Sequence, residues 1–268
     1  MTILVTGATG NIGRLVVDHL LAAGATRVRA LTVDPRRAAL PAQVEVVRGY
    51  LRKVDTLPAA FAGVDRMYLA PTPETVVEVV AAAQRAGVRH IVDLSGEHQS
   101  WWGTVATAVE SFDGGWTHLW AGDFMENSLA WAPQIRATGT VREPSPAAAS
   151  TPVAMDDIAA VAAAVLRQDG HHGRAYTLTG PEILSRVDLL RLIGEAIGRE
   201  LEFVAATREE TVATLSAVMG DTAAWYVDNV LAAMSPHSEP PTHTTEQLTG
   251  RPATTFARWA AEHADDFR

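Results

Sequence analysis

The sequence predicts an α/β fold in which one parallel sheet is covered by helices on both faces. Short apolar runs alternate with longer amphipathic or alanine-rich segments through the first two-thirds of the chain. These runs have the length and composition of strands buried on both faces. Alternating strand and helix signals form βαβ units, and right-handed crossovers then give a doubly wound sheet.

The individual elements follow from the same two patterns. Strands are expected at residues 3–6, 28–31, 44–47, 66–69, 90–94 and 116–120. Helices are expected between them at residues 11–23, 74–86 and 103–112.

After residue 122 the alternation loosens, and we expect a smaller, mostly helical C-terminal lobe. Asp156 and Asp157 are expected to cap one helix, and Ser185 with Asp188 three residues later to cap another. The helices are expected at residues 158–167 and 186–197, short strands at 175–179 and 202–205, and a loop at 235–241.

Composition narrows the class of protein. A chain of 268 residues without cysteine buries a full core without disulfides, and it has no thiolate metal sites. The net charge of -9 argues against nucleic acid as a partner. The longest apolar run, Ile158 to Leu166, is too short to span a membrane, and the N-terminus does not resemble a signal peptide. We expect a cytoplasmic protein and leave its oligomeric state open.

The segment "ILVTGATGNIG" carries the strongest single signal. Gly7, Gly10 and Gly13 follow a predicted strand and begin a predicted helix, as a dinucleotide-binding loop requires. The backbone N–H groups of Asn11, Ile12 and Gly13 would face the phosphates. The loop set is Gly7, Thr9, Gly10, Asn11, Ile12 and Gly13. Residues 1–150 are therefore predicted to bind the dinucleotide, and residues 151–268 to form a substrate lobe, partly interleaved with the sheet.

The second strand should end near the ribose of the cofactor. Asp34 lies at the distance where an acid holds the 2′-hydroxyl of NAD, whereas Arg36 or Arg37 would accommodate the 2′-phosphate of NADP. Asp34 before Pro35 is equally well placed to cap a short helix. The arginines favour NADP, with NAD as the alternative.

The pattern TGxxGxxG at the N-terminus resembles the short-chain dehydrogenase/reductase superfamily, and most of the chain resembles its atypical, NmrA-like branch. The resemblance rests on TGATGNIG, "AGVRHIVDLSG", "WTHLWAGDFMEN", "DDIAAVAAAVL" and "GRAYTLTGPEIL". It implies a Rossmann domain with a small substrate lobe, NADP more often than NAD, and reduction of small molecules. The family also includes members that only sense the cofactor.

The resemblance extends the expected cofactor site to Tyr50, Leu51, Ala70, Pro71 and Ser95. The chain departs from the family pattern around the same cleft. Val33 stands where an arginine often selects NADP, and Tyr50 replaces an acid that contacts adenine, so its ring would stack on the base. Trp120 and Ala121 are expected beside the nicotinamide.

The usual proton donor of this superfamily, a tyrosine followed four residues later by a lysine, is missing. Lys53 is the only lysine, and Gly49 stands four residues before it. Ser95, His98 and Asp123 are the candidate catalytic groups. His98 is the best candidate acid among them, unless it is simply a solvent-facing loop residue. A conjugated acceptor would alternatively take its proton from solvent.

Aromatic residues predict the kind of substrate. Trp101, Trp102 and Trp120 would provide flat apolar walls, unless they are simply core residues. The expected substrate pocket comprises Trp101, Trp102, Trp120, Phe124, Met125 and Asn127. No metal site is expected. The sequence thus predicts an NAD(P)H-dependent reductase of an aromatic or conjugated molecule, such as a quinone, imine or enone. The alternatives are a cofactor-binding redox sensor and a non-redox cyclase or dehydratase of secondary metabolism.

Overall fold

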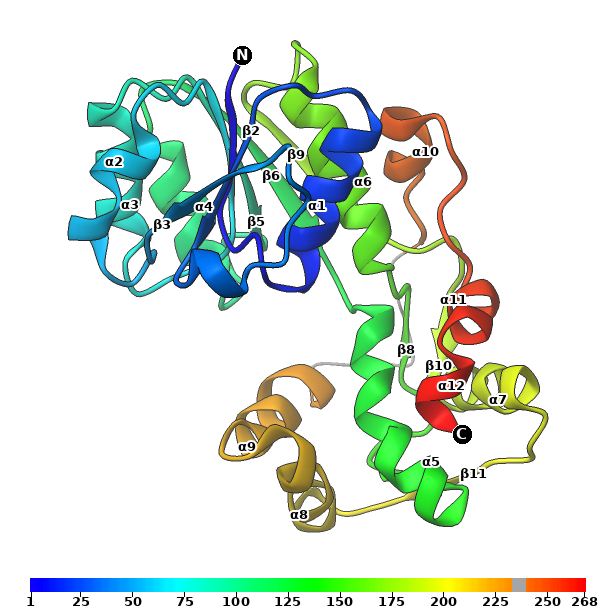
Figure 1. The fold of residues 1–268 in the computed structure, drawn as a ribbon. Helices are drawn as coiled ribbons and strands as arrows, with labels where there is room; N and C mark the ends of the chain where they lie inside the picture. Colours follow the sequence, from blue (N-terminus) through cyan, green and yellow to red (C-terminus); the bar gives the residue numbers. More distant parts are fainter. Residues whose placement is uncertain (233–239) are drawn as a thin grey trace. The chain divides into compact units, whose positions relative to one another are not determined.

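The computed structural model describes residues 1–232 and 240–268, and it consists of two compact units (Figure 1). Unit 1 comprises Met1–Gly122, Met155–Leu178 and Thr244–Pro252, and unit 2 comprises Asp123–Ala154, Thr179–His243 and Ala253–Arg268. These bounds differ from the predicted domains 1–150 and 151–268, because the chain returns twice to unit 1. Residues 235–239 of the predicted loop lie outside the described residues.

Unit 1 is built on a seven-stranded sheet whose strand pairs are all parallel. The strands are β1 (Ile3–Val5), β2 (Val28–Thr32), β3 (Glu45–Arg48), β4 (Arg66–Leu69), β5 (His90–Ser95), β6 (Gly115–Ala121) and β9 (Arg174–Leu178). Their order, β3-β2-β1-β4-β5-β6-β9, reverses direction between β1 and β4. The predicted doubly wound α/β fold is confirmed.

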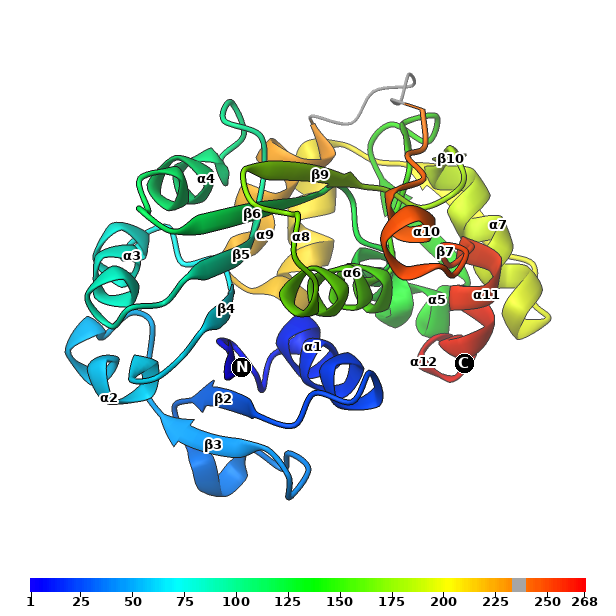
Figure 2. The ribbon, with the colours of Figure 1, turned by 90° about the horizontal axis from the view of Figure 1, so that it is seen from above.

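Helices cover both faces of this sheet. They are α1 (Asn11–Ala22), α2 (Pro58–Phe61), α3 (Val76–Arg85), α4 (Gly103–Glu110), α6 (Met155–Arg167) and α10 (Thr244–Thr249), with short 3₁₀ turns η1 (Pro35–Arg37) and η2 (Val54–Thr56). Figure 2 shows α1 and α6 on one face and α3 and α4 on the other. Helix α6 begins at Met155, so Asp156 and Asp157 lie inside its first turn, and their prediction as caps is wrong. As acids in that turn they still complement the helix dipole.

The point where the strand order reverses is held by one buried hydroxyl. Thr6 Oγ1 donates to the carbonyl oxygen of Tyr68 at 2.9 Å and accepts from the backbone N–H of Ala70 at 2.8 Å. Thr6 follows β1, whereas Tyr68 and Ala70 belong to or follow β4. The side chain therefore fixes the spacing of β1 and β4 at their carboxyl ends, where ligands bind in open α/β sheets.

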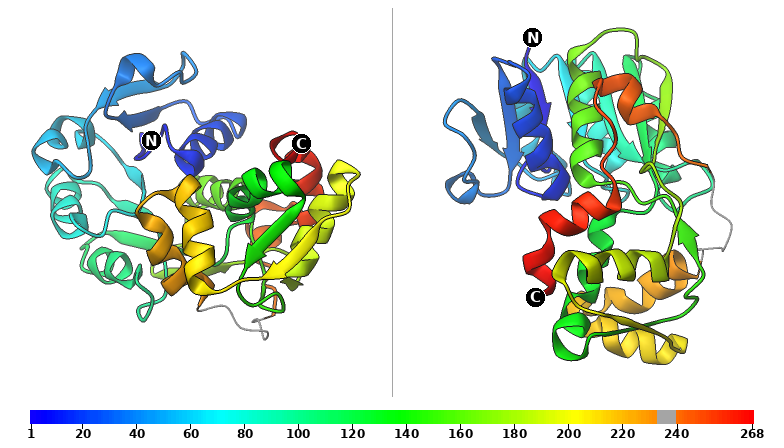
Figure 3. Two further views of the ribbon diagram at one scale, coloured as in Figure 1. Left: turned by 90° about the horizontal axis from the view of Figure 1, so that it is seen from below. Right: turned by 90° about the vertical axis from the view of Figure 1, so that its right-hand side faces the viewer.

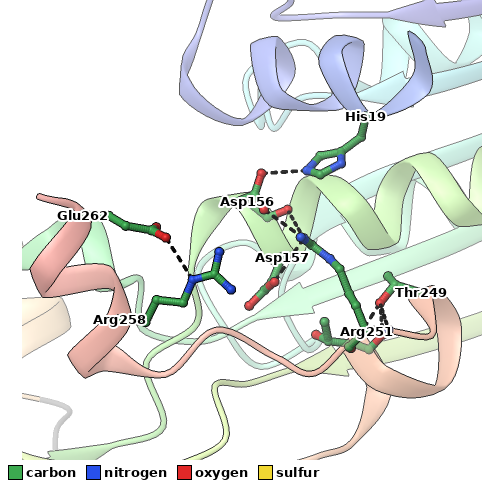
Figure 4. A network of polar contacts seen from close by, with 8 residues as sticks. His19, Asp156, Asp157, Thr249, Arg251, Arg258 and Glu262 are labelled. Carbon is green, nitrogen blue, oxygen red and sulfur yellow. Dashed lines mark hydrogen bonds and ion pairs between the residues drawn. The ribbon is translucent and has the colours of Figure 1, made fainter. Parts of the chain in front are cut away.

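Helix α1 is anchored near its C-terminal end. His19 Nε2 lies 2.6 Å from Asp156 Oδ1, and Arg251 Nη2 lies 2.8 Å from Asp156 Oδ2 and 3.1 Å from Asp157 Oδ1 (Figure 4). The hydrogen bond from His19, followed by that from Arg251, lowers the pKa of Asp156 to about 2. Asp156 therefore stays ionised near neutral pH and links α1 and α6 to the segment that follows α10.

Unit 2 is mostly helical. Its elements are η3 (Met125–Trp131), α5 (Ala132–Thr138), β7 (Thr140–Glu143), β8 (Ala149–Ser150), β10 (Leu184–Ser185), α7 (Arg186–Ile197), β11 (Glu202–Ala205), α8 (Arg208–Met219), α9 (Thr222–Tyr226), the π-helical turn η4 (Val227–Leu231), α11 (Phe256–Glu262) and α12 (Ala264–Phe267). β7 and β11 pair in parallel (Figure 3). Ser185 and Asp188 form the predicted capping box.

A buried ion pair lies inside unit 2. The Glu143 carboxylate accepts a hydrogen bond from Trp131 Nε1 at 2.7 Å and from Arg186 through both Nε, at 3.1 Å, and Nη2. The Arg186 guanidinium also lies over the Trp131 ring, 4.4 Å from its centroid. Burial is the largest influence and would lower the pKa of Arg186, but the charge of Glu143, followed by those of Asp123 and Tyr226 and the hydrogen bond to Glu143, together outweigh it, so the pKa is raised. Arg186 is therefore a buried permanent cation that depends on Glu143.

Candidate functional site

The glycine loop between β1 and α1 has the geometry that a pyrophosphate requires. Gly7 has φ +60°, and a Cβ on Gly13 would lie 2.2 Å from the Gly7 carbonyl oxygen. Gly10 is the N-cap of helix α1, which has no side-chain cap and no acid in its first turn. The backbone N–H groups of Asn11, Ile12 and Gly13 therefore remain open to an anion at the positive end of the helix dipole.

A cavity of about 210 Å³ adjoins this loop. It is lined by Gly7, Thr9, Leu31, Thr32, Val33, Gly49, Tyr50, Leu51, Arg52, Ala70, Pro71 and Thr72. The structure thus brings together six residues that the sequence predicts at the cofactor, namely Gly7, Thr9, Tyr50, Leu51, Ala70 and Pro71. The cavity lies at the carboxyl ends of β1, β2 and β4, beside the reversal of strand order.

A second cleft, of about 520 Å³, continues from Val33 and is lined by Asp34, Pro35, Arg36 and Arg48. Asp34 Oδ1 accepts a hydrogen bond from the backbone N–H of Arg36 at 3.1 Å, so it caps η1 as in the alternative interpretation of the sequence. Arg37 is exposed and does not line the cleft. Arg48, at the end of β3, does line it, although the sequence did not single it out.

The end of β5 carries Ser95, predicted both as cofactor contact and as catalytic group. Ser95 pairs in register with Trp120 of β6. Among the described residues, neither the buried Ser95 Oγ nor the Trp120 Nε1 has a hydrogen-bond partner. Two neighbouring strand ends therefore each present an unused donor, which is costly unless a ligand completes it.

The candidate acid His98 is one end of a chain of alternating imidazoles and carboxylates. His98 Nε2 lies 3.1 Å from each carboxylate oxygen of Glu110, the last residue of α4. Glu110 Oε1 lies 3.6 Å from His118 Nε2, and His118 Nδ1 lies 2.7 Å from Asp93 Oδ2. His118 and Asp93 are 1% and 0% exposed, so the chain runs from the loop after β5 into the core.

Aromatic rings enclose this chain. His118 stacks on Trp116, with ring centroids 4.3 Å apart, and lies nearly parallel to Trp120 at 6.1 Å. His98 meets Trp120 edge-on at 6.2 Å. Trp120, one of the six predicted pocket residues, is thus in contact with two imidazoles of this chain.

The remaining predicted site residues form separate groups. Trp101 and Trp102 pack edge to face, with ring centroids 4.8 Å apart, and Trp101 is exposed. Asp123, Phe124, Met125 and Asn127 belong to unit 2. The Asp123 carboxylate accepts from Asn127 Nδ2 at 2.8 Å and from Ser150 Oγ at 2.9 Å, and Met125 is buried in a hydrophobic cluster. These contacts favour a structural role for Asp123 and Met125.

Sequence reasoning did not include Arg48, Asp93, Glu110 or His118 among the candidate site residues. A signal did exist for two of them. Asp93 and His118 are ionisable residues inside runs that otherwise form buried strands, and a buried ionisable residue needs a partner.

Within residues 1–232 and 240–268, no group of three or more His, Asp or Glu side chains is arranged to hold a metal ion. No helix in the same ranges is long and apolar enough to cross a membrane. The open N–H groups, the glycine contacts and the two cavities fit a dinucleotide.

Comparison with known proteins agrees with this geometry. The chain matches the NAD(P)H-binding family over residues 7–140. It is 35% identical to (4-alkanoyl-5-oxo-2,5-dihydrofuran-3-yl)methyl phosphate reductase of Streptomyces griseus and 34% identical to NAD(P)H azoreductase of Xenophilus azovorans, each match covering 99% of both chains. A solved NADPH-dependent quinone oxidoreductase from Escherichia coli is 25% identical, with a TM-score of 0.84 over 97% of this chain and 99% of the other. This chain therefore belongs to the NAD(P)H-binding family, its fold is similar to that of NmrA, and it is an NAD(P)-dependent oxidoreductase.

Proposed function

We propose that this protein uses NADPH to reduce a small conjugated molecule whose hydride adduct spreads its negative charge over several atoms. The observation that carries the proposal is the missing Tyr-x-x-x-Lys pair beside an otherwise complete glycine loop. The only lysine, Lys53, precedes η2 and has a glycine four residues before it. A simple ketone would form an alkoxide that needs a strong donor as hydride arrives. A conjugated acceptor gives a less basic anion, so a weaker donor such as an imidazolium is sufficient.

The names of the relatives support this substrate class. Azo compounds, quinones and a dihydrofuranone whose ring double bond is conjugated with two carbonyl groups all give delocalised anions when they accept hydride. Trp101, Trp102 and Trp120 would supply flat apolar walls for such molecules. The open donors of Ser95 and Trp120 would bind an oxygen that gains negative charge. His98 would provide the proton, and the bound cofactor supplies the hydride.

The test is a comparison of acceptors with the purified protein. Oxidation of NADPH is followed at 340 nm with 1,4-benzoquinone, an azo dye and an acylated butenolide, with cyclohexanone as the saturated control. We expect turnover with one or more of the conjugated acceptors and none with cyclohexanone. Cofactor binding without turnover would favour the sensor, and no dinucleotide binding would favour a non-redox enzyme. Either result would contradict the proposal.

We also propose that the protein prefers NADP to NAD. We expect it to act in the cytoplasm on a small molecule and not to bind nucleic acid. Arg36 and Arg48 approach the same cleft from η1 and from the end of β3, and the Asp34 carboxylate is engaged in capping. Two guanidinium groups suit a 2′-phosphate, because they bind it through charge-assisted hydrogen bonds. Val33 adds apolar surface beside them.

Replacing Arg48 is expected to weaken NADPH selectively. In Arg48→Ala, the dissociation constant for NADPH should rise about 10- to 100-fold, which corresponds to about 1.4–2.8 kcal/mol, because a charge-assisted contact to phosphate is lost. The constant for NADH should change little. Calorimetric titration of both cofactors measures the ratio, and Arg85→Ala in α3 is the control for the same loss of charge. Equal weakening of both cofactors would refute the assignment.

A further inference from the structure

Four ionisable side chains, from β5, β6, α4 and the loop after β5, follow one another in a continuous series of contacts. In register, Asp93 of β5 stands opposite His118 of β6, so both side chains project from the same face of the sheet. Glu110, at the end of α4, lies between His118 and His98. The order of groups is therefore carboxylate, imidazole, carboxylate, imidazole.

The hydrogen bond to Asp93 determines what His118 presents to Glu110. Nδ1 is 2.7 Å from the Asp93 carboxylate, so this nitrogen carries the proton that is donated. If His118 were neutral, Nε2 would be a bare lone pair facing a carboxylate oxygen 3.6 Å away. Two acceptors repel each other, and Nε2 has no other hydrogen-bond partner in the described part of the chain. A proton on Nε2 of His118 would turn this repulsion into an attraction.

Glu110 is placed to exchange that proton with the surface. Its side chain is 34% exposed, and it lies 3.1 Å from His98 Nε2 but 3.6 Å from His118 Nε2. The first distance is a hydrogen bond, and the second becomes one with a small movement of the glutamate. His98 is 48% exposed and lies in the loop that follows β5, at the carboxyl edge of the sheet.

We propose that Asp93, His118, Glu110 and His98 form a proton store and relay that serves the reductase reaction. The inference rests on the proposed function and adds the source of the proton. When the acceptor gains hydride, the N–H bond of the His98 imidazolium breaks and an O–H or N–H bond forms on the product. Glu110 then transfers the stored proton to His98, and solvent restores it. No oxidant or reductant beyond NADPH and the acceptor is needed.

In this arrangement His98 acts on the substrate, whereas the other three are positioning residues. Asp93 fixes the tautomer of His118, and the rings of Trp116 and Trp120 hold the imidazole in plane. Tyr68 of the neighbouring strand β4 does not compete as a donor. Burial, with the Asp93 charge as a further cause, raises the pKa of Tyr68 far above its ordinary value, so its hydroxyl keeps its proton.

The decisive experiment compares two acceptors that differ in their need for a proton. Hydride reduction of 1,4-benzoquinone gives an anion that must be protonated, whereas hydride addition to malachite green, a cation, gives a neutral product. Glu110→Gln keeps the size of the side chain but cannot pass a proton on. We expect kcat for the quinone to fall at least about tenfold. The rate with the dye and the dissociation constant of NADPH should stay within twofold of the wild-type values.

The matched control is Glu97→Gln, which removes one negative charge in the loop that carries His98. It should leave both rates unchanged. Equal slowing of both acceptors in Glu110→Gln, or no slowing of either, would overturn the relay, as would a wild-type protein that reduces only the dye. If the wild-type protein reduces no conjugated acceptor at all, the proposed function fails instead.

A second measurement does not depend on turnover. Nitrogen-15 labelling of the histidines reports the protonation of each ring nitrogen in the protein without cofactor. We expect a proton at Nε2 of His118 in the wild-type protein and in Glu97→Gln, and its loss in Glu110→Gln. A wild-type His118 with a bare Nε2 would remove the proton store, whatever the kinetics show.

Discussion

Gly13→Ala is expected to weaken the binding of NADPH strongly. The new Cβ would lie 2.2 Å from the Gly7 carbonyl oxygen and 3.1 Å from the Cα of Ala8, both of them backbone atoms that cannot rotate away. The loop must therefore open and move its N–H groups out of register with the phosphates. We expect the NADPH dissociation constant to rise at least about 100-fold, or about 2.8 kcal/mol, by calorimetry.

Substitutions of Gly10 and Gly122 show whether the loss of NADPH binding follows the closeness of the backbone contact. A Cβ on Gly10 would lie 3.2 Å from the Gly7 carbonyl oxygen, so Gly10→Ala should cost less than Gly13→Ala. A Cβ added to Gly122 would meet no atom within 4 Å, so Gly122→Ala should bind NADPH with the wild-type dissociation constant. Circular dichroism shows whether each variant is folded. A folded Gly13→Ala that binds NADPH as tightly as Gly122→Ala would show that the loop does not hold the pyrophosphate.

The largest effect on stability is expected from Glu143→Ala in unit 2. Glu143 and Arg186 are 1% and 3% exposed, so removing the carboxylate leaves a buried guanidinium without its counter-charge. It also leaves Trp131 Nε1 without an acceptor. Breaking a buried ion pair in this way typically costs about 3–5 kcal/mol in the free energy of unfolding. Denaturation in urea, followed by circular dichroism, measures the loss.

The double variant Glu143→Leu with Arg186→Met separates two contributions to the free energy of unfolding. One is the penalty of leaving a buried charge unpaired, and the other is the stabilisation that the ion pair itself provides. Replacing both members by apolar side chains of similar volume is often close to neutral. We therefore expect the double variant to be more stable than Glu143→Ala. If Glu143→Ala lost less than about 1 kcal/mol, the guanidinium would have to be reaching water, contrary to its burial.

The fold was predictable because its signals are local. Each strand of the sheet lies within two residues of a short apolar run, and α1 begins directly after the glycine loop. The start of α6 was missed because an acid in the first turn and an acid before the helix look alike in sequence. Ala154, the residue before the helix, has no polar side chain that would mark the boundary in the sequence.

The site was predictable only where one segment builds it. The glycine loop depends on spacing within seven residues, so sequence alone located it. The pairing of Asp93 with His118 depends on the register of β5 and β6, and the meeting of Arg36 with Arg48 depends on β2 pairing with β3. Neither register is encoded near the residues concerned. The role of Asp34 depended on whether its carboxylate turns toward its own backbone, which only the folded loop determines.

The division of unit 1 into three chain segments has a consequence for biosynthesis. When residue 122 leaves the ribosome, six of the seven strands exist, but α6, which packs beside α1, and the edge strand β9 have not been made. The last segment, which contains α10, ends at Pro252. At ordinary rates of translation this gap lasts on the order of ten seconds. During that time only α1 covers its face of the nascent sheet, so part of that apolar face stays exposed until α6 has been made.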